Sequence, residues 1–243
     1  MKITLENLKK CFGEKVAVDI ESYVINSGEL LGLVGNNGAG KSTLFRLILD
    51  LIKADSGSVR QSGMVNGYNV DIDVSQTESW KDWTSAYVDE AFLIDYLTPD
   101  EYFNFIARIS GLSEDRLNEE LKKYEHFMAG EVMGQKKLIR NLSAGNKQKV
   151  GIVAAMLLHP QLLILDEPFN FLDPSSQSAI KHLLTQYNQE TGATILVSSH
   201  NLNHTVDICP RIALMEQGHI IRDIANRDRE AQKELEDYFE IID

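Results

Sequence analysis

The sequence predicts an α/β fold built around a parallel sheet. Short apolar runs bounded by turn residues recur along the chain, and such runs suit strands that are buried on both faces. Segments with helical periodicity alternate with them, as in α/β proteins. A glycine-rich loop follows one of these runs, at 30–34, and leads directly into a helical pattern at 42–50.

The predicted strands have β-rich, apolar sequences between turn residues. They are Ile3–Leu8, Ile20–Ile25, Leu30–Val34, Ser85–Val88, Leu162–Leu165, Thr194–Val197 and Ile212–Met215. The first of them alternates apolar and polar residues, which is a strand pattern and not that of a signal peptide. Two cysteines, Cys11 and Cys209, provide no disulfide framework, so we expect a reduced, cytoplasmic compartment.

Helix signals are clear between 91 and 141. Thr98 is a capping residue, Pro99 occupies the first helical position, Glu101 completes a capping box, and Gly111 ends the helix. A second helix is expected to carry on one face the residues Leu117, Leu121, Tyr124 and Met128. Further along the chain, Asp173-Pro174 opens a third helix, which Gly192 closes.

These signals predict one domain over 1–243. Its core comprises 1–90 and 142–222, a helical subdomain occupies 91–141, and a charged surface helix is expected over 223–243.

Charge and hydropathy narrow the function classes. The chain has 24 Lys and Arg against 36 Asp and Glu, a net charge of −12 that disfavours broad nucleic-acid binding. The longest apolar run, Val150–Leu158, is much shorter than the about 20 residues that a membrane helix needs. We therefore expect no nucleic-acid partner and no membrane span.

The glycine-rich loop matches the phosphate-loop pattern G-x-x-x-x-G-K-[ST]. Its residues are Gly35, Asn36, Asn37, Gly38, Ala39, Gly40, Lys41, Ser42 and Thr43. Backbone amides and the helix N-terminus make such a loop an anion site. Lys41 would contact the β- and γ-phosphates of a nucleotide, Ser42 would bind Mg²⁺, and Thr43 would lie near the α-phosphate. The alternative is a glycine turn without function.

Two adjacent acids follow the buried strand 162–165. Parallel sheets bind ligands at the carboxyl ends of their strands, so Asp166 would hold Mg²⁺ near the same phosphates. Glu167 would polarise the water that attacks the γ-phosphate. The alternative is an acidic strand end that faces solvent.

A third segment resembles the signature of ATP-binding-cassette (ABC) ATPases, L-S-G-G-Q. It consists of Leu142, Ser143, Ala144, Gly145 and Asn146. Phe171-Leu172-Asp173-Pro174 is similar to the family's D-loop, and Leu196–His200 resembles its switch-histidine segment. The resemblance implies a phosphate-loop NTPase (RecA-like) core with an antiparallel β subdomain and an inserted helical subdomain. It also implies that His200 reaches the γ-phosphate.

The resemblance implies a head-to-tail dimer of this chain with itself or a similar ATPase subunit. Each ATP would lie between one subunit's phosphate loop and the other's signature segment. The signature segment also opens a helix, whose unpaired amides suit a phosphate. Ser143 as a simple helix cap is the alternative, and both roles are compatible.

Four residues stand at positions where the family has a characteristic residue. Phe12 stands where the family has an aromatic residue that stacks on adenine, with core packing as the alternative. Glu90 stands where the family's Q-loop has glutamine, as in many bacterial exporter ATPases. Ala144 and Asn146 replace a signature Gly and Gln, which bears on the hydrolysis rate and the dimer affinity.

The expected function is an ATPase subunit that powers a separate membrane permease at the inner face of the membrane, with Mg²⁺ and ATP as cofactors. Glu90 and the short chain favour an exporter over an importer. A non-transport ABC ATPase acting on ribosomes or DNA, and a metabolic phosphate-loop kinase, are the rival classes. An apolar cluster at 92–97 is expected to be partly exposed and to contact the permease, with closure of the helical subdomain's core as the alternative.

Overall fold

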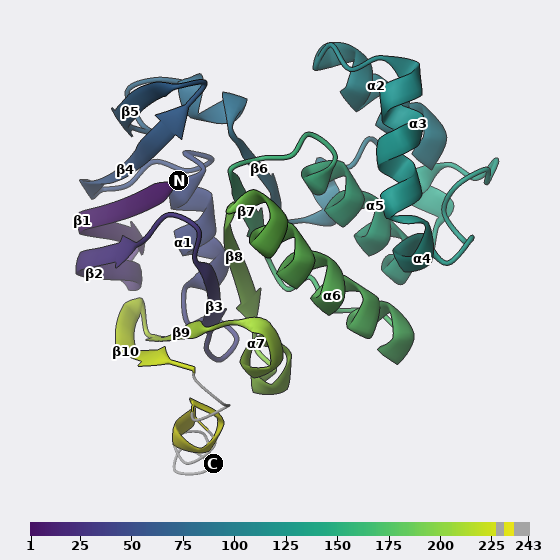
Figure 1. The fold of residues 1–243 in the computed structure, drawn as a ribbon. Helices are drawn as coiled ribbons and strands as arrows, with labels where there is room; N and C mark the ends of the chain where they lie inside the picture. Colours follow the sequence, from purple (N-terminus) through teal and green to yellow (C-terminus); the bar gives the residue numbers. More distant parts are fainter. Residues whose placement is uncertain (227–230, 236–243) are drawn as a thin grey trace.

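The computed structural model describes residues 1–226 and 231–235 and contains two sheets (Figure 1). The first is antiparallel, with order β2-β1-β4-β5, and its strands are β1 (Lys2–Phe12), β2 (Lys15–Ile25), β4 (Ser56–Val65) and β5 (Tyr68–Asp73). The second has order β10-β9-β3-β8-β7-β6. Its strands are β3 (Leu30–Val34), β6 (Thr84–Tyr87), β7 (Leu162–Leu165), β8 (Thr194–Ser199), β9 (Arg211–Glu216) and β10 (His219–Ala225).

The second sheet is parallel from β6 to β9, with β10 as an antiparallel edge strand. Strand β3 lies between β9 and β8, and β7 follows β8. The register pairs Val34 with Ser199, and Leu165 with Val197. The carboxyl ends of β3, β7 and β8 therefore meet at one edge of the sheet, and the predicted site residues follow these ends.

The α-helices within 1–226 are α1 (Lys41–Ile48), α2 (Pro99–Ile109), α3 (Glu114–Lys123), α4 (Glu125–Met128), α5 (Ala144–Met156), α6 (Pro174–Thr191) and α7 (Leu202–Ile208). Short 3₁₀ turns lie at η1 (Ser79–Asp82), η2 (Glu90–Phe92) and η3 (Ile139–Asn141). In Figure 1, α2, α3 and α4 form a lobe apart from the two sheets, with α5 and α6 between that lobe and the parallel sheet.

The parallel sheet buries both faces because its strand residues alternate between two cores. Leu31 and Ile164 belong to a cluster that includes α1 and the antiparallel sheet. Leu30 and Leu163 belong to a second cluster with α5, α6 and the helical lobe. The continuous apolar strands seen in the sequence thus match a sheet covered on both sides, and the predicted α/β class is confirmed.

Several predicted elements are longer or divided differently in the structure. Strands β4, β5 and β10 were not predicted; β5 has no fully buried residue, so its hydrophobic alternation is weak. The predicted second helix breaks at Tyr124 into α3 and α4, and all four residues of its apolar face are buried. The capping box at Thr98 and Glu101 is present as predicted.

The helix expected over 223–243 does not begin at 223, because β10 continues to Ala225 in pairing with β9. Residues 231–235 are helical, and residues 227–230 and 236–243 of that expected helix lie outside the described residues.

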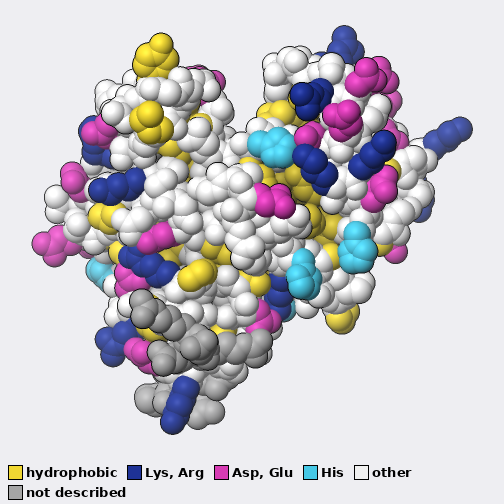
Figure 2. All heavy atoms as spheres, viewed as in Figure 1, with side chains coloured by type: hydrophobic (Ala, Val, Ile, Leu, Met, Phe, Trp, Pro, Cys, Tyr) yellow, Lys and Arg dark blue, Asp and Glu magenta, His cyan; other side chains and the backbone are white. Residues whose placement is uncertain are grey.

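Within the described parts of the chain, no helix combines the length and the apolar character that a membrane span requires. On the face shown in Figure 2, Lys and Arg side chains lie interspersed with Asp and Glu. The same view shows a notch between the lobe of β4 and β5 and the lobe of α2 and α3.

Candidate active site

The loop between β3 and α1 has a backbone that only glycine can follow at two points. Gly35 and Gly40 have φ values of +155° and +113°. A Cβ on Gly35 would lie 2.2 Å from the Met215 carbonyl oxygen, and one on Gly40 would lie 2.2 Å from the Ala17 carbonyl oxygen. Both glycines therefore allow the loop to pass between neighbouring strands and turn into α1.

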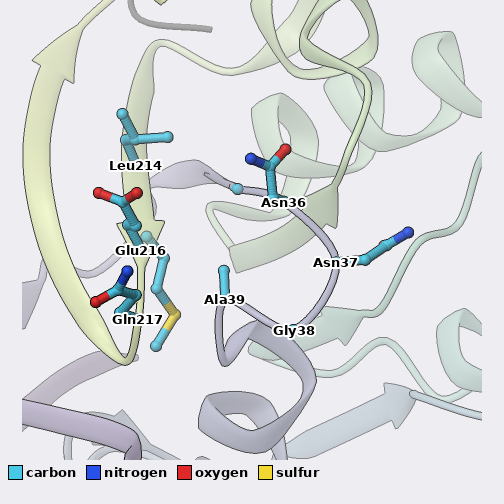
Figure 3. A pocket seen from close by; sticks show the side chains of 9 residues that line it. Asn36, Asn37, Gly38, Ala39, Leu214, Glu216 and Gln217 are labelled. Atoms are coloured by element: carbon cyan, nitrogen blue, oxygen red, sulfur yellow. The ribbon is translucent and has the colours of Figure 1, made fainter. Parts of the chain in front are cut away.

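The crown of this loop is open to solvent, whereas its lysine is buried. Asn36, Asn37 and Gly38 are exposed, and Ala39 is buried. Figure 3 shows Ala39 on the side of the loop nearer to the end of β9 and Asn37 directed away from that strand. A cavity of about 160 Å³ lies between the loop and the strand end at 214–217.

Lys41, at the start of α1, folds back over the loop. Its Nζ donates hydrogen bonds to the carbonyl oxygens of Gly35 at 2.7 Å and Asn36 at 3.4 Å. The same ammonium lies 3.5 Å from Glu167 Oε1. The structure thus brings together the lysine of the phosphate loop, Lys41, and the second of the two adjacent acids, Glu167, which lie far apart in the sequence.

Asp166 directly follows β7 and is partly buried. Its carboxylate accepts a hydrogen bond from the Ser198 hydroxyl, and the Ser42 hydroxyl lies beside it. Burial raises the pKa of Asp166, and the neighbouring hydroxyls of Ser198 and Ser42 oppose the rise. Ser42 and Asp166, the two residues predicted to bind Mg²⁺, therefore lie near each other.

Glu167 has an unusual backbone and two side-chain contacts. Its φ is +48°, a left-handed conformation that is uncommon for a residue with a side chain. The Oε2 atom lies 2.9 Å from His200 Nδ1, and Oε1 faces Lys41. The switch histidine, the acid and the lysine therefore form one connected group.

Ser198 was missed by the sequence analysis. Its Oγ donates to the Asp166 carboxylate and accepts a 2.8 Å hydrogen bond from the backbone N–H of Glu167. The available signal was the position of Ser198, directly before Ser199 and His200 on a strand that ends at the site. The Ser198 hydroxyl orients both Asp166 and Glu167.

The signature segment begins α5 as predicted, with Ser143 as the N-cap. Its hydroxyl accepts a hydrogen bond from the Asn146 N–H at 3.2 Å. Ser143 and Ala144 are exposed, while Leu142, Gly145 and Asn146 are partly buried. Among the described residues, no hydrogen bond or ion pair joins this segment to the phosphate loop of the same chain.

Three further predicted residues lie outside the group around Lys41. Phe12 is 54% exposed at the end of β1, which contradicts the core-packing alternative. Glu90 starts η2 and lies 3.3 Å from Lys147 of α5. Asp173 caps α6, and hydrogen bonds from the Ser175 and Ser176 hydroxyls lower the pKa of its carboxyl.

Comparison with known proteins agrees with this arrangement. The family model "ABC transporter" matches residues 19–170. The linearmycin resistance ATP-binding protein LnrL of Bacillus subtilis (strain 168) is 33% identical over 216 residues, covering 89% of this chain and 67% of its own length. The bacitracin transport ATP-binding protein BcrA of Enterococcus faecalis is also 33% identical, over 223 residues, covering 91% of this chain and 68% of its own length.

Solved structures support the same fold. An ATP-binding subunit of an ABC transporter superposes with a TM-score of 0.80 at 27% identity over 100% of both chains. The dimeric bacterial ABC transporter cassette MJ0796 has a TM-score of 0.78 at 24% identity, covering 93% of this chain and 99% of its own.

The chain belongs to the ABC transporter family, as an ATP-binding subunit with ATPase activity. The predicted class, a phosphate-loop NTPase with an antiparallel sheet beside a parallel one, is confirmed. The rival reading as a metabolic kinase is therefore wrong.

Proposed function

We propose that this ABC ATPase hydrolyses ATP with Glu167 as the general base and with His200 as the residue that orients the Glu167 carboxylate. One observation carries the proposal: Glu167 lies within 3.5 Å of both Lys41 and His200, at the edge where the phosphate loop begins. In this arrangement Lys41 faces the β- and γ-phosphates, and Gly35–Thr43 bind them through backbone amides. Phosphoryl transfer requires mainly positioning and charge stabilisation, which these groups supply.

The residues present fit a magnesium ion. Mg²⁺ prefers hard oxygen ligands, and Asp166 and Ser42 provide a carboxylate and a hydroxyl side by side. A cation would also offset the cost of keeping the partly buried Asp166 ionised. When bound, the ion supplies neutralisation of the phosphate charge. Glu90 reaches the same region only through water in this proposal.

The functional unit is a head-to-tail dimer. Ser143 and Ala144 are exposed at the N-terminus of α5, so the signature segment is free to meet the nucleotide of a second subunit. The absence of any polar contact between this segment and its own phosphate loop, among the described residues, supports that assignment. In this dimer Asp173, which comes after Glu167 in the sequence, lies at the subunit interface. Phe12 stacks on adenine. Lys15, across the hairpin turn from Phe12, has its Nζ 3.7 Å from the position of a Cβ on Gly38.

The partner that ATP hydrolysis drives is a separate membrane permease. Three residues after β6 are exposed although they are apolar: Phe92 at 53%, Ile94 at 36% and Tyr96 at 72%. Leu93 between them is buried, so the segment both closes the helical core and presents an apolar surface. Exposed apolar patches of this kind mark contact sites. We propose that the helical subdomain 91–141 and the core 1–90 with 142–222 form the two units that the permease contacts.

We further propose export, at the inner face of the cell membrane. One relative is named for resistance to linearmycin, a function that removal of a toxic compound achieves. Others are named for uptake, such as the methionine import protein MetN 3 of Bacillus anthracis, which is 32% identical. Glu90 in place of glutamine favours the exporter group.

Two measurements test this function. Purified protein with ATP and Mg²⁺ should release phosphate without any acceptor, and a protein that turns over only with an acceptor would contradict the proposal. The direction is tested in inverted membrane vesicles that contain the subunit with its permease. Accumulation of cargo inside these vesicles on ATP addition supports export, and depletion supports import.

A further inference from the structure

The segment after β7 holds two residues in conformations that side chains rarely adopt. Glu167 has φ +48° and Phe171 has φ +63°. Such backbone costs free energy and persists only where neighbouring groups fix it. The groups that fix this segment therefore also determine where the Glu167 carboxylate lies.

The Glu167 residue is held through both of its backbone polar groups. Ser198 Oγ accepts from its N–H at 2.8 Å, and Gln148 Nε2 donates to its carbonyl oxygen at 3.0 Å. Gln148 lies in the second turn of α5 and is only 7% exposed. A buried amide that donates to one defined carbonyl is a specific constraint, because leaving either group unpaired would cost the desolvation of a polar atom.

Helix α5 also contacts the far end of the same segment. A Cβ on Gly145 would lie 2.6 Å from the carbonyl oxygen of Phe171, so the helix backbone and the segment touch directly. Gln148, Glu167 and Phe171 together line a cavity of about 220 Å³ with Glu90 and Ala144. The first two turns of α5 are thus attached to both ends of the segment that carries Glu167.

We propose that Gln148 is a positioning residue for Glu167, and that it links the signature helix of one subunit to the base of that same subunit. The proposal rests on the function of Glu167 and of the head-to-tail dimer given above. In that dimer the N-terminus of α5 meets the ATP of the partner. A displacement of α5 on contact with that ATP moves the Glu167 carbonyl through the Gln148 hydrogen bond. The catalytic base of one nucleotide site thereby responds to the ATP bound at the other site.

The central variant is Gln148→Met, which keeps the length of the side chain and removes the donor. We expect kcat to fall on the order of 10²-fold, as for a misplaced catalytic group, with KM for ATP unchanged. The matched control is Gln186→Met. Gln186 Nε2 donates to Glu190 Oε1 at 2.7 Å on the exposed surface of α6, away from the segment that carries Glu167. This control should retain the wild-type kcat.

Two readouts separate positioning of the base from simple support of the helix. In a Glu167→Gln background, Gln148→Met should cause no further loss of the residual single-turnover rate, because both changes act on one group. The doubly substituted protein should still form the ATP-bound dimer in gel filtration. An additive loss, a lost dimer or a wild-type kcat in Gln148→Met would each overturn the proposal.

The outcomes also separate this proposal from the function on which it rests. If Glu167→Gln alone keeps wild-type turnover, the assignment of the base fails, and the proposal fails with it. If Gln148→Met does not melt cooperatively, Gln148→Asn replaces it. That side chain keeps the amide but is one methylene too short to reach the carbonyl, and the same criteria apply.

Discussion

Glu90 and Lys147 form an ion pair, with 3.3 Å between Glu90 Oε2 and Lys147 Nζ, that joins the segment after β6 to the signature helix α5. The neighbouring Asp89 pairs at 3.4 Å with Arg46 of α1, the helix that follows the phosphate loop. The adjacent acids Asp89 and Glu90 are thus paired with two different helices, α1 and α5. The segment that leads to the apolar residues 92–97 is connected to both α1 and α5.

Reversing the charge of Lys147 tests this pair. Lys147→Glu places two carboxylates together and should destabilise the protein, and adding Glu90→Lys should restore the attraction. Both side chains are accessible to water, Lys147 at 19% and Glu90 at 59%, so the coupling should be about 0.5 kcal/mol. A double-mutant cycle by urea unfolding measures it. A charge-swapped protein no more stable than the single variants would show that the pair contributes nothing.

The helices and the parallel strands could be predicted because their signals are local. The capping box at Thr98, the Pro at 174 and the Gly at 192 each act within one helical turn, and the structure has all three. Strands β4, β5 and β10 could not be predicted in this way. β5 and β10 are edge strands without a buried residue, and β4, which lies between β1 and β5, buries only two of its ten residues, so no clear hydrophobic period marks them.

Lys41→Ala should abolish ATP binding. The loop loses the ammonium that hydrogen-bonds its Gly35 and Asn36 carbonyl oxygens, and bound phosphates would lose an opposite charge. Isothermal titration with ATP and Mg²⁺ measures the affinity. Lys9→Ala, which breaks a surface pair with Asp19, is the control and should bind as the wild type does. Unchanged affinity in Lys41→Ala would contradict the phosphate-loop assignment.

Phe92→Ser and Tyr96→Ser should weaken permease binding and leave basal ATPase activity intact. Both rings are mostly exposed, so serine leaves no cavity and the fold should persist. Co-purification with the membrane partner and phosphate release report the two properties. Leu93→Ser, at a buried position between them, should instead lower stability. Normal permease binding by both surface variants would place the contact elsewhere.

Asp173→Asn should destabilise the protein in a pH-dependent way. The Ser175 and Ser176 hydroxyls hold the pKa of Asp173 below its usual range, so the folded state favours the ionised carboxylate. This contribution is fully present above the unfolded pKa of about 4 and is lost as pH falls through the lower folded value. The difference in unfolding free energy between wild type and Asn should therefore be largest near neutral pH and shrink in acid. A difference independent of pH would contradict this.

The site was only partly accessible to sequence reasoning. Lys41, Asp166, Glu167 and His200 follow strand ends in recognisable motifs, and a parallel sheet brings such ends together. No sequence motif links Ser198 or Gln148 to Glu167, because their hydrogen bonds to Glu167 span 31 and 19 residues and depend on the fold.

The most direct test of the whole account is the oligomeric state of Glu167→Gln in gel filtration with ATP and Mg²⁺. An amide cannot act as the base, so ATP should remain uncleaved between two subunits, and the protein should elute as a dimer. Ser143→Arg in the same background blocks the signature segment and should return it to a monomer. If Glu167→Gln turns ATP over at the wild-type rate, or if it stays monomeric with ATP bound, the proposed base and the head-to-tail dimer are contradicted.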